Sequence, residues 1–240
     1  MISIKGKTAL VTGSSRGIGQ QIALGLAQLG CNIILHGRTK KSCFESRQLL
    51  QKYSIETFIV SGELSDEKQV QHLIQQIKKL NKPVDILYNN AAIMTEYRPD
   101  YWQHTWEDWL ESFKVNVIAM YRLCRAFVPS MVERNFGRVI NLTSGIMHQP
   151  ELAPYGASKW AVNKLTDDLA GKVNDTNVRI NTLDPGWCKT DLGGPNADHV
   201  VQAVLPGALA PALVDNNGKN GAEFSAIHHD LDPDLLKKLE

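Results

Sequence analysis

Short apolar runs rich in β-branched residues alternate with stretches of helical periodicity along the chain. The runs predict seven strands, at Thr8–Thr12, Asn32–His36, Thr57–Val60, Val84–Tyr88, Gly137–Leu142, Val178–Thr182 and Ala222–Ile227. Between them, apolar residues recur at helical spacing, as at Val70, Leu73, Ile74, Ile77 and Leu80. This alternation is typical of βαβ crossovers and predicts an α/β fold, a doubly wound parallel sheet with helices on both faces.

Local signals place two helix starts within this pattern. Ser42-x-x-Glu45 predicts a capping box that opens a helix running through Leu49 and Leu50. Thr105, just before Trp106, predicts another N-cap. No linker, repeat or low-complexity segment divides the chain, so we expect one domain over residues 1–240 with a C-terminal tail at 228–240.

Composition excludes several classes of protein. With 43% hydrophobic residues, general disorder is excluded, and 26 Lys+Arg against 25 Asp+Glu leave a net charge of +1 without the basic stripe of a nucleic-acid binder. No apolar run approaches the roughly 20 residues of a membrane span, and no signal-peptide core follows Met1. Because the four cysteines lie far apart and a core of this size needs no disulfides, we expect a reduced, cytoplasmic protein.

A glycine cluster directly follows the first predicted strand and opens the first helix. The segment Gly13-Ser14-Ser15-Arg16-Gly17-Ile18-Gly19 has the spacing G-x-x-x-G-x-G. Glycine permits a tight turn and a close backbone approach to pyrophosphate, and the free N–H groups of the helix N-terminus attract phosphate. A glycine cluster can also serve only as a sterically required turn, but its position favours nucleotide binding.

Tyr155 and Lys159 lie four residues apart in a predicted helix, on one face of it. A free tyrosine is a poor base near neutral pH, and an ammonium one turn away is expected to lower its pKa. Ser144, after the fifth strand, can hydrogen-bond the same substrate oxygen. Taken alone, the Tyr–Lys spacing equally fits an ordinary amphipathic helix.

Together with these residues, Asn89-Asn90-Ala91-Ala92, Asn116 and Asp184-Pro-Gly-Trp-Cys-Lys-Thr190 stand in the order found in a known family. The chain resembles the short-chain dehydrogenase/reductase family, with its carbonyl-reductase-like branch, over nearly its whole length. The resemblance implies a Rossmann-type single domain that moves hydride between NADP(H) and a carbonyl or secondary alcohol carbon. It implies that Tyr155 is the general acid/base, that Ser144 holds the carbonyl oxygen, that Lys159 tunes Tyr155 and holds the ribose, and that Asn116 supports a proton-relay water.

The same resemblance implies contacts to the cofactor and the substrate. Cofactor contacts are expected at Gly13, Ser15, Arg16, Gly17, Ile18, Gly19, Gly37, Arg38, Glu63, Leu64, Asn90, Ala91, Ala92, Tyr155, Lys159, Pro185, Gly186 and Thr190. Substrate contacts are expected at Met94, Ile146, His148, Trp187 and Cys188, with a short substrate lobe around residues 187–200. Relatives that prefer NAD carry an acidic residue where Gly37 stands; glycine leaves room for a 2′-phosphate, which Arg38 and Arg16 can bind, so we expect NADPH to be preferred.

Some features depart from the family pattern. Ala92 and Glu63 replace a glycine and an aspartate, Ser144 and Tyr155 are only 11 positions apart, and the usual Val-Asp-Gly-Gly ending is absent. Adjacent His228 and His229, with Asp230 and Asp232, are expected to form a surface tail, because neighbouring strand residues point to opposite faces; no metal site is predicted.

Other functions remain open at this stage. A 3-oxoacyl-carrier-protein reductase shares the whole catalytic set, but it would need a basic patch for its acidic carrier. A non-enzymatic NADP(H) sensor on the same fold would usually have lost the tyrosine or the lysine. Family habit and the apolar residues Val117, Met120, Trp160 and Val162 predict a homodimer through two helices; whether tetramers form is left open.

Overall fold

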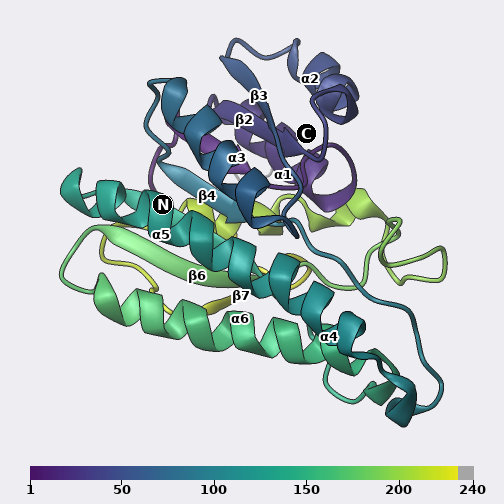
Figure 1. Ribbon diagram of the computed structural model, residues 1–240. Coiled ribbons are helices and arrows are strands. Elements are labelled where there is room, and N and C mark those ends of the chain that lie inside the picture. Colours follow the sequence, from purple (N-terminus) through teal and green to yellow (C-terminus); the bar gives the residue numbers. More distant parts are fainter. Residues whose placement is uncertain (232–240) are drawn as a thin grey trace.

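A single seven-stranded sheet, with all strands parallel, forms the centre of the molecule. The computed structural model describes residues 1–231, and its strand order is β3-β2-β1-β4-β5-β6-β7 (Figure 1). The strands are β1 (Thr8–Val11), β2 (Asn32–Gly37), β3 (Thr57–Ser61), β4 (Ile86–Asn89), β5 (Gly137–Leu142), β6 (Val178–Asp184) and β7 (Glu223–Ser225). All seven predicted strands are confirmed, with ends shifted by at most two residues, as at β7.

Both faces of the sheet are apolar, because apolar residues follow one another along each strand and successive residues point to opposite faces. In β2, Ile33 and Leu35 belong to one buried cluster, whereas Ile34 belongs to the other. Ala9 and Val11 of β1 face the first cluster in the same way, and Leu10 faces the second. Each face of the sheet therefore offers an apolar surface on which a layer of helices can pack.

Within residues 1–231 there are six α-helices, of which five pack on these two faces, while α4 packs on α6 and on the helical segment that follows it (Figure 1). The six helices are α1 (Gly17–Gln28), α2 (Phe44–Leu50), α3 (Glu67–Lys79), α4 (Trp106–Phe113), α5 (Met120–Glu133) and α6 (Ala153–Lys172). Side chains of α1, α2 and the short 3-10 turns at Val201–Val204 and Gly207–Ala212 fill the first cluster, and those of α3, α5 and α6 fill the second. The predicted layers on both faces are confirmed.

Between α4 and α5, the helix continues through a wider π-helical segment at Lys114–Ala119. The continuous stretch Trp106–Glu133 is long and apolar enough, by length and composition alone, to cross a membrane. Its buried side chains, such as Met120 and Leu123, pack on the sheet in the second cluster. Packing on a core sheet thus accounts for its apolar character.

One of the two predicted caps is confirmed. Thr105 accepts from the N–H of Asp108 at 3.1 Å, and the Asp108 carboxylate accepts from the N–H of Thr105, which makes a full capping box for α4. Ser42 does not cap α2, so that prediction is wrong. The chain forms a 3-10 turn at Lys41–Cys43 before α2, and the Ser42 hydroxyl donates to the carbonyl oxygen of Thr39 at 2.7 Å.

Because all strands run parallel, their carboxyl ends lie along one edge of the sheet. β1 is flanked by β2 on one side and β4 on the other, and the strand order reverses there. Ligands of open α/β sheets bind outside the carboxyl ends of the strands at such a switch point. The predicted tail at 228–240 includes residues 232–240, which lie outside the described part.

Candidate active site

The glycine loop after β1 is closed too tightly for a side chain. A Cβ on Gly19 would lie 2.4 Å from the Gly13 carbonyl oxygen and 2.5 Å from Asn90 Nδ2. Asn90 Nδ2 donates to the Thr12 carbonyl oxygen at 2.8 Å and so ties the loop to the end of β4. No side chain caps α1 and its first turn holds no acidic residue, so its N–H groups remain available to an anion. These residues fit a bound pyrophosphate.

Beside this loop, the end of β2 has no room for a side chain at Gly37. An added Cβ would lie 2.4 Å from Ser42 Oγ and 2.9 Å from the buried Cys43 Sγ. Arg38 follows as an exposed residue. Arg16, also exposed, forms an ion pair with Asp191 of the predicted substrate lobe, with Nε and Oδ2 2.8 Å apart. Joint binding of a 2′-phosphate by Arg16 and Arg38 stays a prediction.

His36, which the sequence analysis did not single out, joins two cofactor-facing loops. Its Nδ1 accepts from the N–H of Gly13 at 3.2 Å, and its Nε2 lies 3.1 Å from the Gly62 carbonyl oxygen. Burial lowers the pKa of His36 to about 4, so the ring is neutral and donates through Nε2. In the sequence, the one feature that could have pointed to His36 is its position at the end of a buried strand, just before Gly37. Beyond Gly62 follow Glu63, whose N–H donates to Gln69 Oε1, and the buried Leu64.

The predicted catalytic residues meet where the first turns of α6 lie beside the end of β5. Tyr155 and Lys159 are buried, with 8% and 5% of their surface exposed. Lys159 Nζ lies 5.7 Å from the centroid of the Tyr155 ring and donates to the Leu142 carbonyl oxygen at 2.9 Å. Ser144 follows Leu142 by two residues, and its hydroxyl interacts with that of Tyr155. The structure thus brings Ser144, Tyr155 and Lys159 together.

Asn116 lies in the π-helical segment and is buried between two other elements. Its Oδ1 accepts from the N–H of Ile93 and its Nδ2 donates to the Ile93 carbonyl oxygen, both at 2.9 Å. The same Nδ2 also donates to Ser158 Oγ at 2.9 Å, and Ser158 donates to the Tyr155 carbonyl oxygen. Asn116 therefore joins the loop after β4 to the first turn of α6. Its role in a proton relay stays a prediction.

Burial controls the protonation of the catalytic pair. It raises the pKa of Tyr155 to about 12; the Ser144 hydroxyl opposes this shift and the charge of Asp184 adds to it. Burial also lowers the pKa of Lys159 to about 8, against the effect of Asp184. The expected lowering of the tyrosine pKa by the ammonium is thus not found here: desolvation raises this pKa, and the group that opposes the rise is the Ser144 hydroxyl. At neutral pH, Tyr155 holds its proton.

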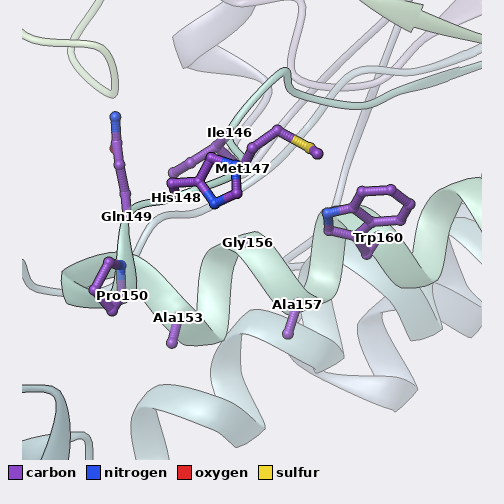
Figure 2. A pocket seen from close by; sticks show the side chains of 9 residues that line it. All are labelled: Ile146, Met147, His148, Gln149, Pro150, Ala153, Gly156, Ala157 and Trp160. Carbon is purple, nitrogen blue, oxygen red and sulfur yellow. The ribbon is translucent and has the colours of Figure 1, made fainter.

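Of the predicted substrate residues, two share a cavity. A cavity of about 420 Å³ lies between the loop after β5 and the outer face of α6. Ile146 and His148 line it from the loop, and Gly156 and Trp160 from the helix (Figure 2).

The other predicted substrate residues lie elsewhere. Met94 is partly exposed on the loop after β4. Trp187, also exposed, donates from Nε1 to the Gly193 carbonyl oxygen at 2.8 Å. Cys188 is buried in the core cluster on the α1 side of the sheet, with 3% exposed, and burial raises the pKa of its thiol. Contacts of these three residues with a substrate stay predictions.

Further cofactor contacts were expected from the segment after β6 and from the residues after β4. Pro185 is buried, Gly186 has a φ of +72°, and Thr190 packs within 3.4 Å of a Cβ built on Gly17. Ala91 donates its N–H to Thr12 Oγ1 at 3.0 Å, and Ala92 follows it in the partly buried chain. Within residues 1–231, no group of three or more His, Cys, Asp or Glu side chains could hold a metal ion.

Comparison with known proteins assigns the class that this fold and site suggest. A family model described as short chain dehydrogenase matches residues 7–200. Gluconate 5-dehydrogenase of Gluconobacter oxydans is 31% identical over 194 residues, covering 80% of this chain and 75% of that protein. The 5-keto-D-gluconate 5-reductase of Escherichia coli K12 is 30% identical over 194 residues, with 80% and 76% covered.

Among solved structures, a 3-oxoacyl (acyl-carrier-protein) reductase from Agrobacterium tumefaciens C58 with NADP bound superimposes with a TM-score of 0.82. It is 28% identical and covers 93% of each chain. The chain therefore belongs to the short-chain dehydrogenase/reductase family. It is an oxidoreductase by that membership, and the resemblance found in its sequence is confirmed.

Proposed function

We propose that this protein reduces a carbonyl group with NADPH, or oxidises the corresponding secondary alcohol with NADP+, using Tyr155 as the general acid/base. The observation that carries the proposal is the buried group of Tyr155, Lys159 and Ser144 at the carboxyl edge of the sheet. A tyrosine whose pKa is about 12 keeps its proton at neutral pH. That state suits the donation of a proton to a carbonyl oxygen.

The residues present fit the cofactor along the whole edge. The glycine loop and the uncapped N-terminus of α1 would hold the pyrophosphate, and Arg38 the 2′-phosphate. When bound, NADPH supplies the hydride that adds to the carbonyl carbon. As the C=O π electrons move to oxygen, Tyr155 donates its hydroxyl proton there, Ser144 donates a hydrogen bond to the same oxygen, and the Lys159 ammonium stabilises the tyrosinate that remains.

Support for NADP(H) over NAD(H) comes from the end of β2. In this protein the volume that a side chain at Gly37 would need is taken by Ser42 and Cys43, so a carboxylate reading the ribose hydroxyls has no space there. A guanidinium at Arg38 can bind a phosphate bidentately. We expect a preference for NADPH of roughly 10- to 150-fold in kcat/KM, the range of a charged hydrogen bond.

The likeness to a gluconate 5-dehydrogenase and a 5-keto-D-gluconate 5-reductase favours small hydroxylated substrates. A 3-oxoacyl-carrier-protein reductase is the second candidate, favoured by the likeness to the Agrobacterium enzyme. That activity needs a basic surface for an acidic carrier, and the net charge of +1 leaves little excess for one. A sensor without catalysis is disfavoured, because both Tyr155 and Lys159 are kept and buried.

We also propose that the protein is cytoplasmic and forms homodimers. Of the residues expected at the interface, Val117, Met120 and Val162 are buried in the core, and Trp160 is exposed. The support for a dimer is therefore the exposed apolar side chains of Ile118, Tyr121 and Trp160, on the π-helical segment, α5 and α6. Such a patch suits a twofold interface, in which both subunits use the same surface. The absence of the family's usual C-terminal sequence leaves tetramers without support.

The reaction is tested by following NADPH absorbance with a panel of ketones, aldehydes and sugars. Tyr155→Phe should lower kcat by about 10²- to 10⁴-fold, because only the hydroxyl is removed. Its NADPH affinity, measured by fluorescence titration, should stay near that of the wild type. Tyr53→Phe, which removes a hydroxyl far from the site, is the matched control. A Tyr155→Phe enzyme that keeps more than a tenth of the wild-type rate contradicts the mechanism.

A further inference from the structure

Asp184, the last residue of β6, presents a carboxylate at the active-site edge, and the proposed mechanism gives it no role. Its backbone is fixed, since its carbonyl oxygen accepts from the N–H of Ala226 at 2.9 Å. Its Oδ1 accepts from the N–H of Gly186 at 2.9 Å, which closes the turn that leads into Pro185 and Gly186. The Ala226 contact therefore holds the backbone of Asp184, and the Gly186 contact holds one oxygen of its carboxylate.

The second carboxylate oxygen is left free by this arrangement. Asp184 Oδ2 lies 2.9 Å from the position of a Cβ built on Gly145, the residue directly after Ser144. Among residues 1–231, no Lys, Arg or His pairs with Asp184, and its Oδ2 accepts no hydrogen bond. The side chain is half-buried, and Oδ2 is not one of the fully buried polar atoms that lack a hydrogen-bond partner, so a ligand can reach it. An accessible anionic acceptor thus stands beside the loop that carries Ser144.

Gly145 shows that this oxygen lies against the loop that carries Ser144. A side chain at position 145 would collide with Oδ2, so the carboxylate occupies the space next to the Ser144 backbone. Its charge also acts on Tyr155 and Lys159, raising the pKa of both. A group that affects both members of the catalytic pair and borders the serine lies within reach of atoms near the reacting carbonyl.

We propose that Asp184 is a specificity-determining residue, whose free carboxylate oxygen accepts a hydrogen bond from a substrate hydroxyl close to the reacting carbonyl. The preferred substrates are then hydroxy ketones and hydroxy aldehydes of the sugar type. Plain ketones lack the donor, and keto acids place a second negative charge against Asp184. The proposal rests on the carbonyl reduction described above and names the substrate class of that site.

Two matched series isolate this contact. Acetone, hydroxyacetone and pyruvate share one reacting carbonyl with CH₃, CH₂OH and COO⁻ beside it. Acetophenone, 2-hydroxyacetophenone and phenylglyoxylate repeat the comparison on a larger substrate. For the wild type, kcat/KM should be at least about 10-fold higher for the hydroxyl member than for either of the other two, since a charged acceptor left unpaired costs binding of its analogue.

Asp184→Asn changes the chemistry of the contact while keeping the turn. Because Gly186 holds one amide oxygen in place of Oδ1, the amide nitrogen replaces Oδ2, and an acceptor becomes a donor. The preference for the hydroxyl member over the keto acid should then fall by about 10-fold or more, mainly because the keto acid is no longer repelled. Asp175→Asn, in the exposed turn after α6, is the matched control and should leave all ratios unchanged.

The outcomes separate this proposal from the reaction on which it rests. If the wild type oxidises NADPH with these ketones but does not favour the hydroxyl member, or if Asp184→Asn lowers all members equally, the assignment of Asp184 is wrong and the reductase stands. If none of the six is reduced while other carbonyls are, the proposed substrate class is wrong. Loss of NADPH oxidation with every carbonyl points instead to failure of the proposed function. Should Asp184→Asn not fold, the wild-type ratios decide alone.

Discussion

Gly37 offers a sharp test of how the end of β2 selects its cofactor. Its backbone cannot yield easily, because it pairs with Ser61 in the sheet and its carbonyl oxygen accepts from the N–H of Gly62 at 3.2 Å. An added Cβ would meet Ser42 Oγ at 2.4 Å and Cys43 Sγ at 2.9 Å. Ser42 is itself held by its hydrogen bond to Thr39, and Cys43 is fully buried. The smallest possible side chain therefore overfills this site.

The cost follows from the size of this overlap. Overpacking by one carbon in a fixed site lowers the free energy of unfolding by about 1–3 kcal/mol, so Gly37→Ala should lower the melting temperature by about 2–10 °C in a domain of this size. Ser42→Ala removes the closer of the two colliding atoms. Gly37→Ala should therefore cost measurably less in the Ser42→Ala background, a coupling that a double-mutant cycle by urea unfolding reads directly.

Gly37→Asp adds charge to this steric effect. Its carboxylate would repel a 2′-phosphate, so NADPH affinity should fall by more than about 10-fold. NADH affinity should not rise in the single variant, because the carboxylate cannot take up its place; it should rise only when Ser42→Ala makes room. These affinities are measured by fluorescence titration of NADPH and NADH against the wild type, Gly37→Asp, Ser42→Ala and the double variant. A Gly37→Asp protein that gains NADH binding alone and melts at the wild-type temperature would refute the packing argument.

Three further predictions concern the pH dependence of activity, the pH dependence of stability and the assembly of the protein. With a Lys159 pKa of about 8, kcat/KM for NADPH should fall roughly tenfold per pH unit well above pH 8; a flat profile from pH 7 to 10 contradicts this. The pKa of His36 falls from 6.5 in the unfolded chain to about 4 in the folded protein. Its contribution of about 3 kcal/mol to the free energy of unfolding is therefore fully present above pH 6.5 and is lost as the pH falls through 4. Urea unfolding of His36→Asn should therefore show a weaker loss of stability between pH 7 and 4.5. Light scattering at micromolar concentration should show a dimer for the wild type and a monomer for Trp160→Asp; a wild-type monomer contradicts the proposed interface.

The fold could be predicted because each strand is apolar on both faces and therefore unambiguous. Ile33, Ile34 and Leu35 are all buried, and no polar face competes with this assignment. The failure at Ser42 shows that one local pattern can lose to another, here a turn within three residues. The Ser-x-x-Glu spacing fits a capping box, yet the turn after β2 offers Ser42 the carbonyl of Thr39 first.

The site could be predicted only for residues whose type and spacing carry the chemistry. Ser144, Tyr155 and Lys159 belong to that group, and the structure places them together. His36 and Asp184 have no such spacing. His36 matters because its two ring nitrogens meet Gly13 and Gly62, and Asp184 because a glycine after Ser144 leaves room for its carboxylate. Both depend on loops that approach each other only in the folded chain.

Desolvation explains why the pKa values of Tyr155 and Lys159, the two predicted catalytic groups, differ so much. A free tyrosine and a free lysine have similar pKa values, near 10 and 10.5, and their spacing alone does not say which one gives up a proton. Burial disfavours the charged form of each, so the pKa of Tyr155 rises to about 12 and that of Lys159 falls to about 8. Groups whose pKa values are pushed apart in this way take distinct roles. In the proposed mechanism, Tyr155 would hold its proton until a developing alkoxide accepts it, and Lys159, charged at neutral pH, would stabilise the tyrosinate. The same packing of α6 against β5 that builds the core therefore keeps Tyr155 in its protonated form at neutral pH.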